Sequence, residues 1–133
     1  MLVWGRCVRA LLDTSAIVGI EVRDVAIDSV NDPLVSVVTI AELSLGVVMA
    51  KDGETRALRR KTLLSTLDGF GCIEVDQAVA FRYADLMGAA RSHGRRPAVQ
   101  DTLIAATALV AGIPLITQDV GFLAFPELDV ILV

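Results

Sequence analysis

The stretch AVQDTLIAATALVAGIPLITQD, residues 98–119, is almost entirely apolar and carries only two charges, Asp101 and Asp119. Its first part predicts a buried helix that ends at Gly112, and the letters PLIT that follow predict a buried strand. A helix and the next strand of a parallel sheet run in opposite directions, so the two ends of the stretch return to one edge of the sheet. Asp101 and Asp119 are therefore expected to lie close together.

The rest of the chain alternates short β-branched or apolar runs with amphipathic segments. This alternation predicts a parallel sheet that is covered by helices on both faces. A length of 133 residues fits one domain, in which residues 1–7 are interpreted as an N-terminal extension or a start-site choice. The predicted strands are 8–13, 34–39, 72–75, 114–117 and 128–133, the last at an edge, and the predicted helices are segments between 14 and 32, then 39–50, 54–70, 76–94 and 100–112.

Composition narrows the class of protein. Apolar residues make up 54% of the chain and charged residues 21%, which excludes a disordered chain and indicates a core-rich domain. The net charge of −4 means that nucleic acid would be bound through local basic patches or metal ions.

Cys7 and Cys72 lack the spacing of a metal site or of a disulfide framework, so we expect two reduced thiols. The apolar runs are too short to span a membrane and no signal-peptide cleavage site follows the start, so a cytoplasmic protein is expected.

Two more acids are predicted at the same edge of the sheet as Asp101 and Asp119. Asp13 ends the first predicted strand, and Glu42 lies in the first turn predicted after the second strand. Each acid also has a local explanation. Asp13 could cap a helix, and Glu42 could form a capping box with Thr39. Asp101 could cap a helix or lie in its first turn, and Asp119 could be a turn residue. Four such acids at one edge favour a shared site over four independent roles.

The chemistry of such a site follows from its oxygen ligands. Carboxylates that lie close together repel each other unless a cation is present, and an oxygen-only cluster suits Mg²⁺ or Mn²⁺. These ions lower the pKa of bound water and neutralise phosphate, which makes phosphodiester hydrolysis feasible. The hydroxyls of Thr14, Ser15 and Thr117 could orient water or ligands there, or make ordinary capping and turn hydrogen bonds, which is at least as good an explanation for Ser15.

Four segments in order, LLDTSAIVG, VVTIAELSLGV, the stretch 98–119 and the F of DVGF, resemble the PIN-domain family, and most closely its VapC-type toxins. The resemblance covers nearly the whole chain. It implies a PIN-like three-layer α/β/α domain with a central, mostly parallel sheet of four to five strands. It also implies a metal-dependent endoribonuclease in which Thr117 stands beside the last acid. The acidic quartet implied as catalytic and metal-binding is Asp13, Glu42, Asp101 and Asp119.

The resemblance implies partners as well. They are a small VapB-type antitoxin that neutralises the toxin, a structured RNA such as tRNA or rRNA, and a second copy of the chain. The homodimer would form a heterotetramer or a larger assembly with the antitoxin. Arg91, Arg95 and Arg96 precede Asp101 and are candidate RNA contacts, whereas the basic residues of 56–61 are more simply a solvated helix face.

Two other functions remain open from the residues alone. One is phosphoryl transfer on a small molecule with Asp13 as nucleophile, although Ser15 stands where a second aspartate would be expected. The other is a catalytically silent PIN-like binding module, against which the complete quartet argues.

Overall fold

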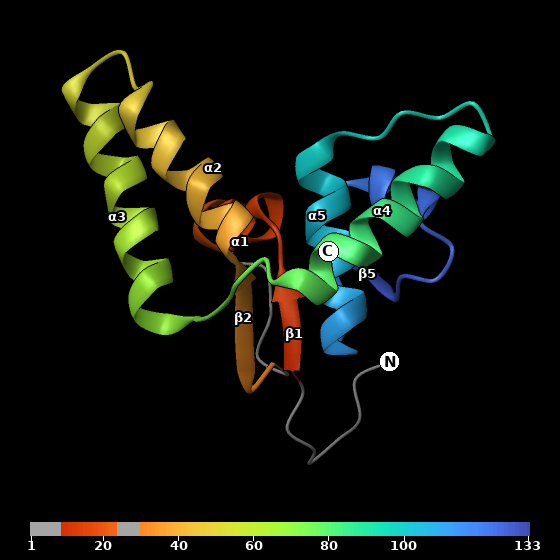
Figure 1. Cartoon of the computed structure of the whole chain (residues 1–133). Coiled ribbons are helices and arrows are strands. Elements are labelled where there is room, and N and C mark those ends of the chain that lie inside the picture. Colours follow the sequence, from red (N-terminus) through yellow and green to blue (C-terminus); the bar gives the residue numbers. More distant parts are fainter. Residues whose placement is uncertain (1–8, 24–29) are drawn as a thin grey trace.

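The computed structural model describes residues 9–23 and 30–133 and contains one five-stranded sheet (Figure 1). The strand order is β3-β2-β1-β4-β5, and every pair of neighbouring strands is parallel. The predicted fold class is confirmed, and the last strand lies at an edge as expected. The elements are β1 (Arg9–Leu12), α1 (Thr14–Arg23), β2 (Asp32–Ser36), α2 (Val37–Val48), α3 (Gly53–Gly69), β3 (Gly71–Ile73), α4 (Gln77–Ser92), α5 (Val99–Ala111), β4 (Leu115–Thr117), the short 3₁₀ helix η1 (Val120–Ala124) and β5 (Val130–Leu132).

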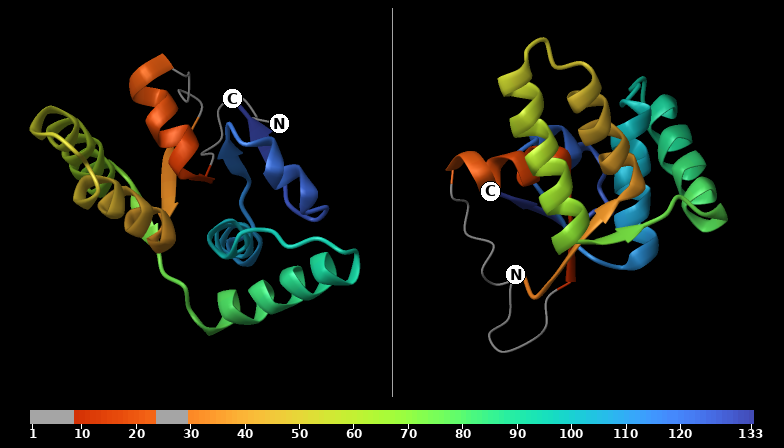
Figure 2. Two further views of the ribbon diagram at one scale, coloured as in Figure 1. Left: turned by 90° about the horizontal axis from the view of Figure 1, so that it is seen from above. Right: turned by 90° about the vertical axis from the view of Figure 1, so that its left-hand side faces the viewer.

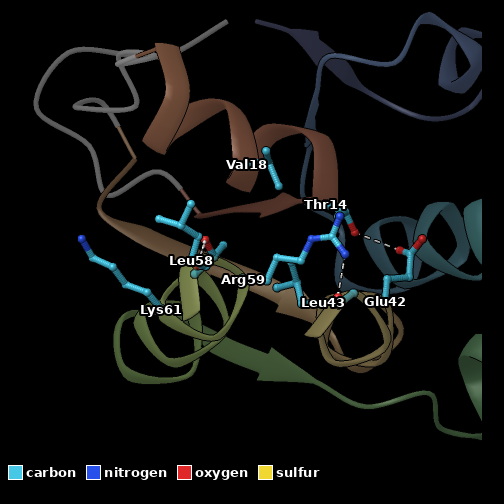
Figure 3. A pocket seen from close by; sticks show the side chains of 9 residues that line it. Thr14, Val18, Glu42, Leu43, Leu58, Arg59 and Lys61 are labelled. Atoms are coloured by element: carbon cyan, nitrogen blue, oxygen red, sulfur yellow. Dashed lines mark hydrogen bonds between the residues drawn. The ribbon is translucent and has the colours of Figure 1, made fainter. Parts of the chain in front are cut away.

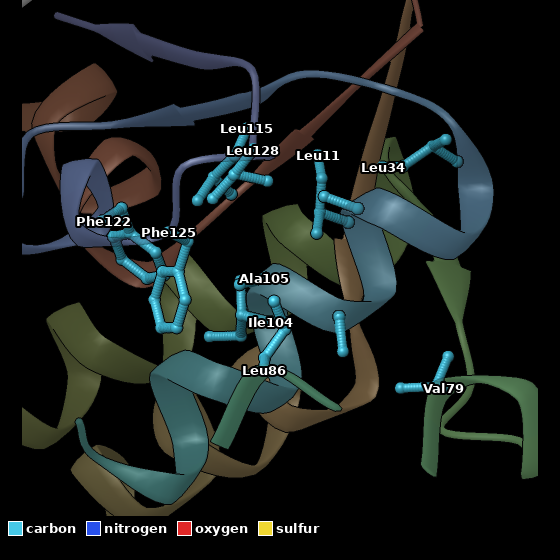
Figure 4. Packing of buried hydrophobic residues seen from close by; sticks show 12 residues of the cluster. Leu11, Leu34, Val79, Leu86, Ile104, Ala105, Leu115, Phe122, Phe125 and Leu128 are labelled. Carbon is cyan, nitrogen blue, oxygen red and sulfur yellow. The ribbon is translucent and has the colours of Figure 1, made fainter. Parts of the chain in front are cut away.

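Helices cover both faces of the sheet, as the alternation of elements predicted. Successive residues of β1 point to opposite faces. Leu11 packs with α4, α5 and η1 in one buried cluster (Figure 4), and Leu12 packs with α1 and α2 in another. Seen from above, α1, α2 and α3 lie on one side of the strands and α4 and α5 on the other (Figure 2). The fold therefore has three layers, with the strand ends free to carry a site.

The second strand is shorter than predicted, and α2 begins at Val37, two residues before the predicted start at Thr39. The cause is Ser36, whose hydroxyl oxygen accepts a hydrogen bond from the backbone N–H of Val38 and caps the helix. Glu42 consequently lies in the second turn of α2. The predicted first-turn position and the predicted capping box between Thr39 and Glu42 are therefore wrong.

Helix α3 packs only Leu63 of its four leucines against the core and buries two threonines as well. Leu58, Leu64 and Leu67 are exposed, whereas Thr62 and Thr66 are buried. The buried hydroxyls donate hydrogen bonds to carbonyl oxygens one turn earlier in the helix, so their burial leaves no polar group unpaired. This arrangement leaves exposed leucines on the side of the molecule formed by α2 and α3.

The remaining boundaries agree closely with the sequence. Helix α5 ends at Gly112, which adopts a left-handed conformation with φ of 68° that glycine tolerates best. Cys72 is a free, exposed thiol on β3. Cys7 lies outside the described residues, and so do residues 24–29 of the first predicted helical region. Within the residues that the structure describes, no helix is both long and apolar enough to cross a membrane.

Candidate active site

All four acids of the predicted quartet line one cavity of about 290 Å³ at the carboxyl edge of the sheet. The strands β1 and β4 end here, and helices α1 and α5 begin here. The topology therefore brings together side chains that are far apart in the chain, as the sequence predicted. We call this space the acidic cavity, and its lining residues are Asp13, Thr14, Ser15, Val18, Glu42, Asp101, Ile104 and Asp119.

Asp13 is buried and firmly held. One carboxylate oxygen accepts hydrogen bonds from the backbone N–H of Ala16 at 3.0 Å and from the Ser15 hydroxyl at 2.8 Å. The other oxygen accepts a hydrogen bond from the Thr117 hydroxyl at 2.7 Å. A carboxylate has about four acceptor positions, and these bonds use three of them. Asp13 therefore caps α1, as its local explanation held, and still keeps an acceptor position for a ligand.

Ser15 and Thr117 connect the start of α1 to the end of β4. The Thr117 oxygen accepts a hydrogen bond from the backbone N–H of Asp119 at 2.9 Å. The Ser15 oxygen accepts one from the backbone N–H of Gln118, also at 2.9 Å, and the two hydroxyl oxygens lie 3.2 Å apart. These hydroxyls thus fix the backbone that carries Asp119 against the carboxylate of Asp13.

Glu42 enters the acidic cavity from α2. The Thr14 hydroxyl donates a hydrogen bond of 3.0 Å to its carboxylate. Burial raises the pKa of Glu42; the bond from Thr14 opposes this effect, and the negative charges of Asp101 and Asp13 add to it. The Glu42 carboxylate is therefore a stronger base than an exposed glutamate.

Asp101 lies in the first turn of α5 and does not cap the helix, since Ala98 occupies the N-cap position without a side-chain bond. Burial raises the pKa of Asp101, and the charges of Asp119 and Asp13 raise it further. Asp119 is exposed, and its carboxylate accepts a hydrogen bond of 2.8 Å from the backbone N–H of Gly121, so it also serves as a turn residue. The two acids of the opening stretch thus interact across the acidic cavity.

The acids converge without forming a finished ion-binding cluster. Among the described residues, no group of three or more His, Cys, Asp or Glu side chains is arranged to hold a metal ion. Burial is the main reason for the raised pKa values of Glu42 and Asp101, and the negative charges of the neighbouring acids raise them further. A cation that entered the acidic cavity would relieve this repulsion.

Residues 10–128 match the family model of the PIN domain. The chain belongs to the PIN-domain family. It is 38% identical over 125 residues to ribonuclease VapC4 of Mycobacterium tuberculosis, an alignment that covers 92% of this chain and 95% of the relative. The expected resemblance to VapC-type toxins is thereby confirmed.

Solved structures agree with this PIN-domain assignment. A member of the VapBC toxin–antitoxin systems from Mycobacterium tuberculosis, VapBC-5, superposes with a TM-score of 0.81 at 32% identity, covering 94% of this chain and 98% of that one. FitAcB from Neisseria gonorrhoeae superposes with a TM-score of 0.76 at 31% identity, covering 91% and 95%. The similarity spans nearly the full length of both toxin-related chains.

Of the three arginines predicted to contact RNA, Arg95 has a structural partner in this PIN domain. Its guanidinium donates a hydrogen bond of 2.8 Å to the carbonyl oxygen of Ala124 and so ties the loop before α5 to η1. Arg91 and Arg96 are exposed. The RNA contacts of all three arginines stay predictions, but Arg95 also joins the two segments that carry Asp101 and Asp119.

A second cavity, of about 700 Å³, adjoins the acidic cavity and was missed from the sequence (Figure 3). Both cavities are lined by Thr14, Val18 and Glu42. The sequence of the basic run 56–61 does not show which of its residues line this second cavity, because the packing of α3 against α2 determines which side chains face it. We call it the α2–α3 cavity, and its other lining residues are Leu43, Gly46, Leu58, Arg59, Lys61 and Thr62.

Proposed function

We propose that this PIN domain is a metal-dependent endoribonuclease toxin that hydrolyses RNA phosphodiester bonds. The observation that carries the proposal is the convergence of Asp13, Glu42, Asp101 and Asp119 on one cavity. RNA as the substrate class is supported by the relative named ribonuclease VapC4. The toxin role is supported by the similarity to members of toxin–antitoxin complexes.

The residues present fit Mg²⁺ or Mn²⁺. All four candidate ligands, Asp13, Glu42, Asp101 and Asp119, offer carboxylate oxygens, which both ions prefer. Mg²⁺ commonly binds proteins through only one or two carboxylates and keeps several waters, so it does not require a finished cluster of three side chains. When bound, the ion would supply positive charge to the phosphate and make water more acidic.

The chain's own residues divide the remaining work. The hydrogen bonds from Ser15 and Thr117 hold the Asp13 carboxylate in one orientation, which suits a residue that must bind without moving. Glu42 and Asp101 line the same cavity from α2 and α5, which suits a group that takes a proton from the attacking water. We therefore assign proton transfer to Glu42 or Asp101 and fixed binding to Asp13.

The proposal includes partners and a location. A VapB-type antitoxin would neutralise the toxin, and a second copy of the chain would form a homodimer. Exposed apolar side chains on α2, namely Leu45, Val48 and the C-capping Met49, support the existence of partner surfaces. The place of action is the cytoplasm, where the proposed RNA substrates occur.

Incubation of the antitoxin-free protein with total cellular RNA and Mg²⁺ or Mn²⁺ tests the activity. We expect RNA fragments that disappear when EDTA is added. Asp101→Asn should abolish cleavage, whereas the matched variant Asp68→Asn, at an exposed position of α3, should cleave like the wild type. Cleavage that survives both EDTA and Asp101→Asn would come from a contaminant, and a wild type that cleaves no RNA would support a silent binding module.

A further inference from the structure

We infer that the α2–α3 cavity binds the nucleotide next to the scissile phosphate, with Arg59 as its phosphate-binding residue. This inference rests on the proposed ribonuclease function and extends it to a second subsite. The volume of about 700 Å³ lies in the range of cavities that hold small organic ligands. The space is thus large enough for one nucleotide.

The α2–α3 cavity adjoins the acidic cavity. Thr14, Val18 and Glu42 line both the acidic cavity and the α2–α3 cavity, so the two cavities lie side by side and meet at these side chains. An RNA strand whose phosphate lies among the acids must continue on either side of that phosphate. The α2–α3 cavity offers such a continuation directly beside the acids.

One wall of the α2–α3 cavity is apolar. Val18 and Leu58 are exposed, with 44% and 62% of their surface accessible, and buried Leu43 completes an apolar wall. Exposed apolar side chains inside a cavity gain free energy when a flat apolar group covers them. The face of a nucleobase is such a group.

Arg59 brings a positive charge to the α2–α3 cavity. The Arg59 side chain extends from α3 toward Thr14 and Glu42, whereas Lys61, which also lines the cavity, points away from these two residues (Figure 3). One guanidinium nitrogen of Arg59 donates a 2.7 Å hydrogen bond to the carbonyl oxygen of Gly46, which fixes the orientation of the group. Among the residues that the structure describes, no carboxylate lies within ion-pair distance of Arg59. Its remaining N–H donors can therefore bind a phosphate.

The test is RNA binding by the full chain without antitoxin. The probe is a fluorescein-labelled, mixed-sequence RNA 12-mer, bound in Ca²⁺ at several salt concentrations, with a gel to confirm that it stays intact. We expect Arg59→Gln to weaken binding about fivefold and to make the slope of log K against log salt less negative by about 0.7. Arg60→Gln removes the same charge from a neighbouring position that does not line the cavity, and it should change both quantities much less.

A second pair of variants tests the apolar wall. Leu58→Glu places a negative charge in the cavity, and Leu67→Glu places it elsewhere on α3 at a similarly exposed leucine. Only Leu58→Glu should weaken RNA binding. Thermal melting should show that both variants fold.

The outcomes separate this site from the proposed function. Equal RNA affinities of the two arginine variants, in a protein that cleaves total RNA, would overturn the nucleotide site and leave the ribonuclease function intact. If Arg59→Gln and Leu58→Glu weakened antitoxin binding but not RNA binding, the cavity would belong to the protein partner and the inference would be wrong. A wild type that does not bind the 12-mer would also overturn it.

Discussion

Thr117 donates a 2.7 Å hydrogen bond to Asp13, a residue 104 positions away in the chain. The bond joins the end of β4 to the end of β1, two strands that pair directly in the centre of the sheet. Because the Thr117 oxygen also accepts from the backbone N–H of Asp119, one hydroxyl sets the relative positions of two acids. The acidic cavity is therefore built on a buried polar link, and removal of this link should be costly.

Thr117→Val keeps the shape of the side chain and removes both hydrogen bonds. We expect it to lower the free energy of unfolding by about 1–3 kcal/mol, because the buried Asp13 carboxylate loses a donor. Urea denaturation measures this change, and Thr117→Ser, which keeps the hydroxyl, should recover most of it. A valine variant as stable as the wild type would show that the link contributes little.

Glu42→Gln should stabilise the metal-free protein at neutral pH. Burial raises the pKa of Glu42 above 4.5, so between pH 4.5 and the raised pKa the folded state holds a proton that the unfolded state has lost. The stability that wild-type Glu42 contributes is fully present below pH 4.5 and is lost as the pH rises through the raised value. Glutamine can still accept the hydrogen bond from Thr14 and carries no charge at any pH.

Thermal melting in EDTA across this pH range measures the effect. The Tm of Glu42→Gln should exceed that of the wild type by a few degrees at pH 7, and the difference should shrink as the pH falls through the raised pKa of Glu42 toward 4.5, below which it should be gone. Glu74→Gln, an exposed glutamate just after β3, is the control and should show no such trend. A difference that is independent of pH would contradict the assignment to Glu42.

Mg²⁺ or Mn²⁺ should stabilise the wild type. Binding to the folded state alone adds about 2.7 kcal/mol when the free ion is at about 100 times its Kd. The gain should be absent in Asp101→Asn and present in Asp68→Asn, because only Asp101 lines the acidic cavity. Differential scanning fluorimetry with and without the ion gives the answer, and an unchanged wild-type Tm would count against a metal site.

Gly19→Ala should destabilise the protein through Gln118. A Cβ on Gly19 would lie 2.1 Å from the side-chain nitrogen of Gln118, so that buried amide would have to move. Because the obstacle is the end of a flexible side chain and alanine favours the helix by about 1 kcal/mol over glycine, we expect a net cost below about 1 kcal/mol. Gln118→Ala removes the obstacle, and the double variant should regain part of the loss in a double-mutant cycle. Purely additive effects would mean that the clash is relieved in another way.

Arg95→Gln should cost more stability than Arg96→Gln. The first variant removes the donor to the Ala124 carbonyl, a loss of about 0.5–1.5 kcal/mol. The second changes an exposed arginine and should alter stability by less than about 0.5 kcal/mol. Urea denaturation distinguishes the two, and equal effects would show that the Arg95 bond does not hold the loop.

Much of the fold could be predicted because its signals are local. The apolar run of α5 and its end at Gly112 are visible in consecutive residues, and so are the short strands. The start of α2 was missed because β-branched Val37 and Val38 suggest a strand. Ser36 caps the helix there, and a cap is decided by backbone geometry as much as by residue type.

The sequence by itself determined the order of elements and the edge of the sheet at which the four acids meet, because alternation along the chain fixes which ends lie together. Tertiary structure alone decided the bond between Thr117 and Asp13, the burial of Thr62 and Thr66 in α3 while three of its leucines are exposed, and the α2–α3 cavity. Those features depend on which side chains meet across distant elements. Such contacts are set by packing in three dimensions, which no local periodicity encodes.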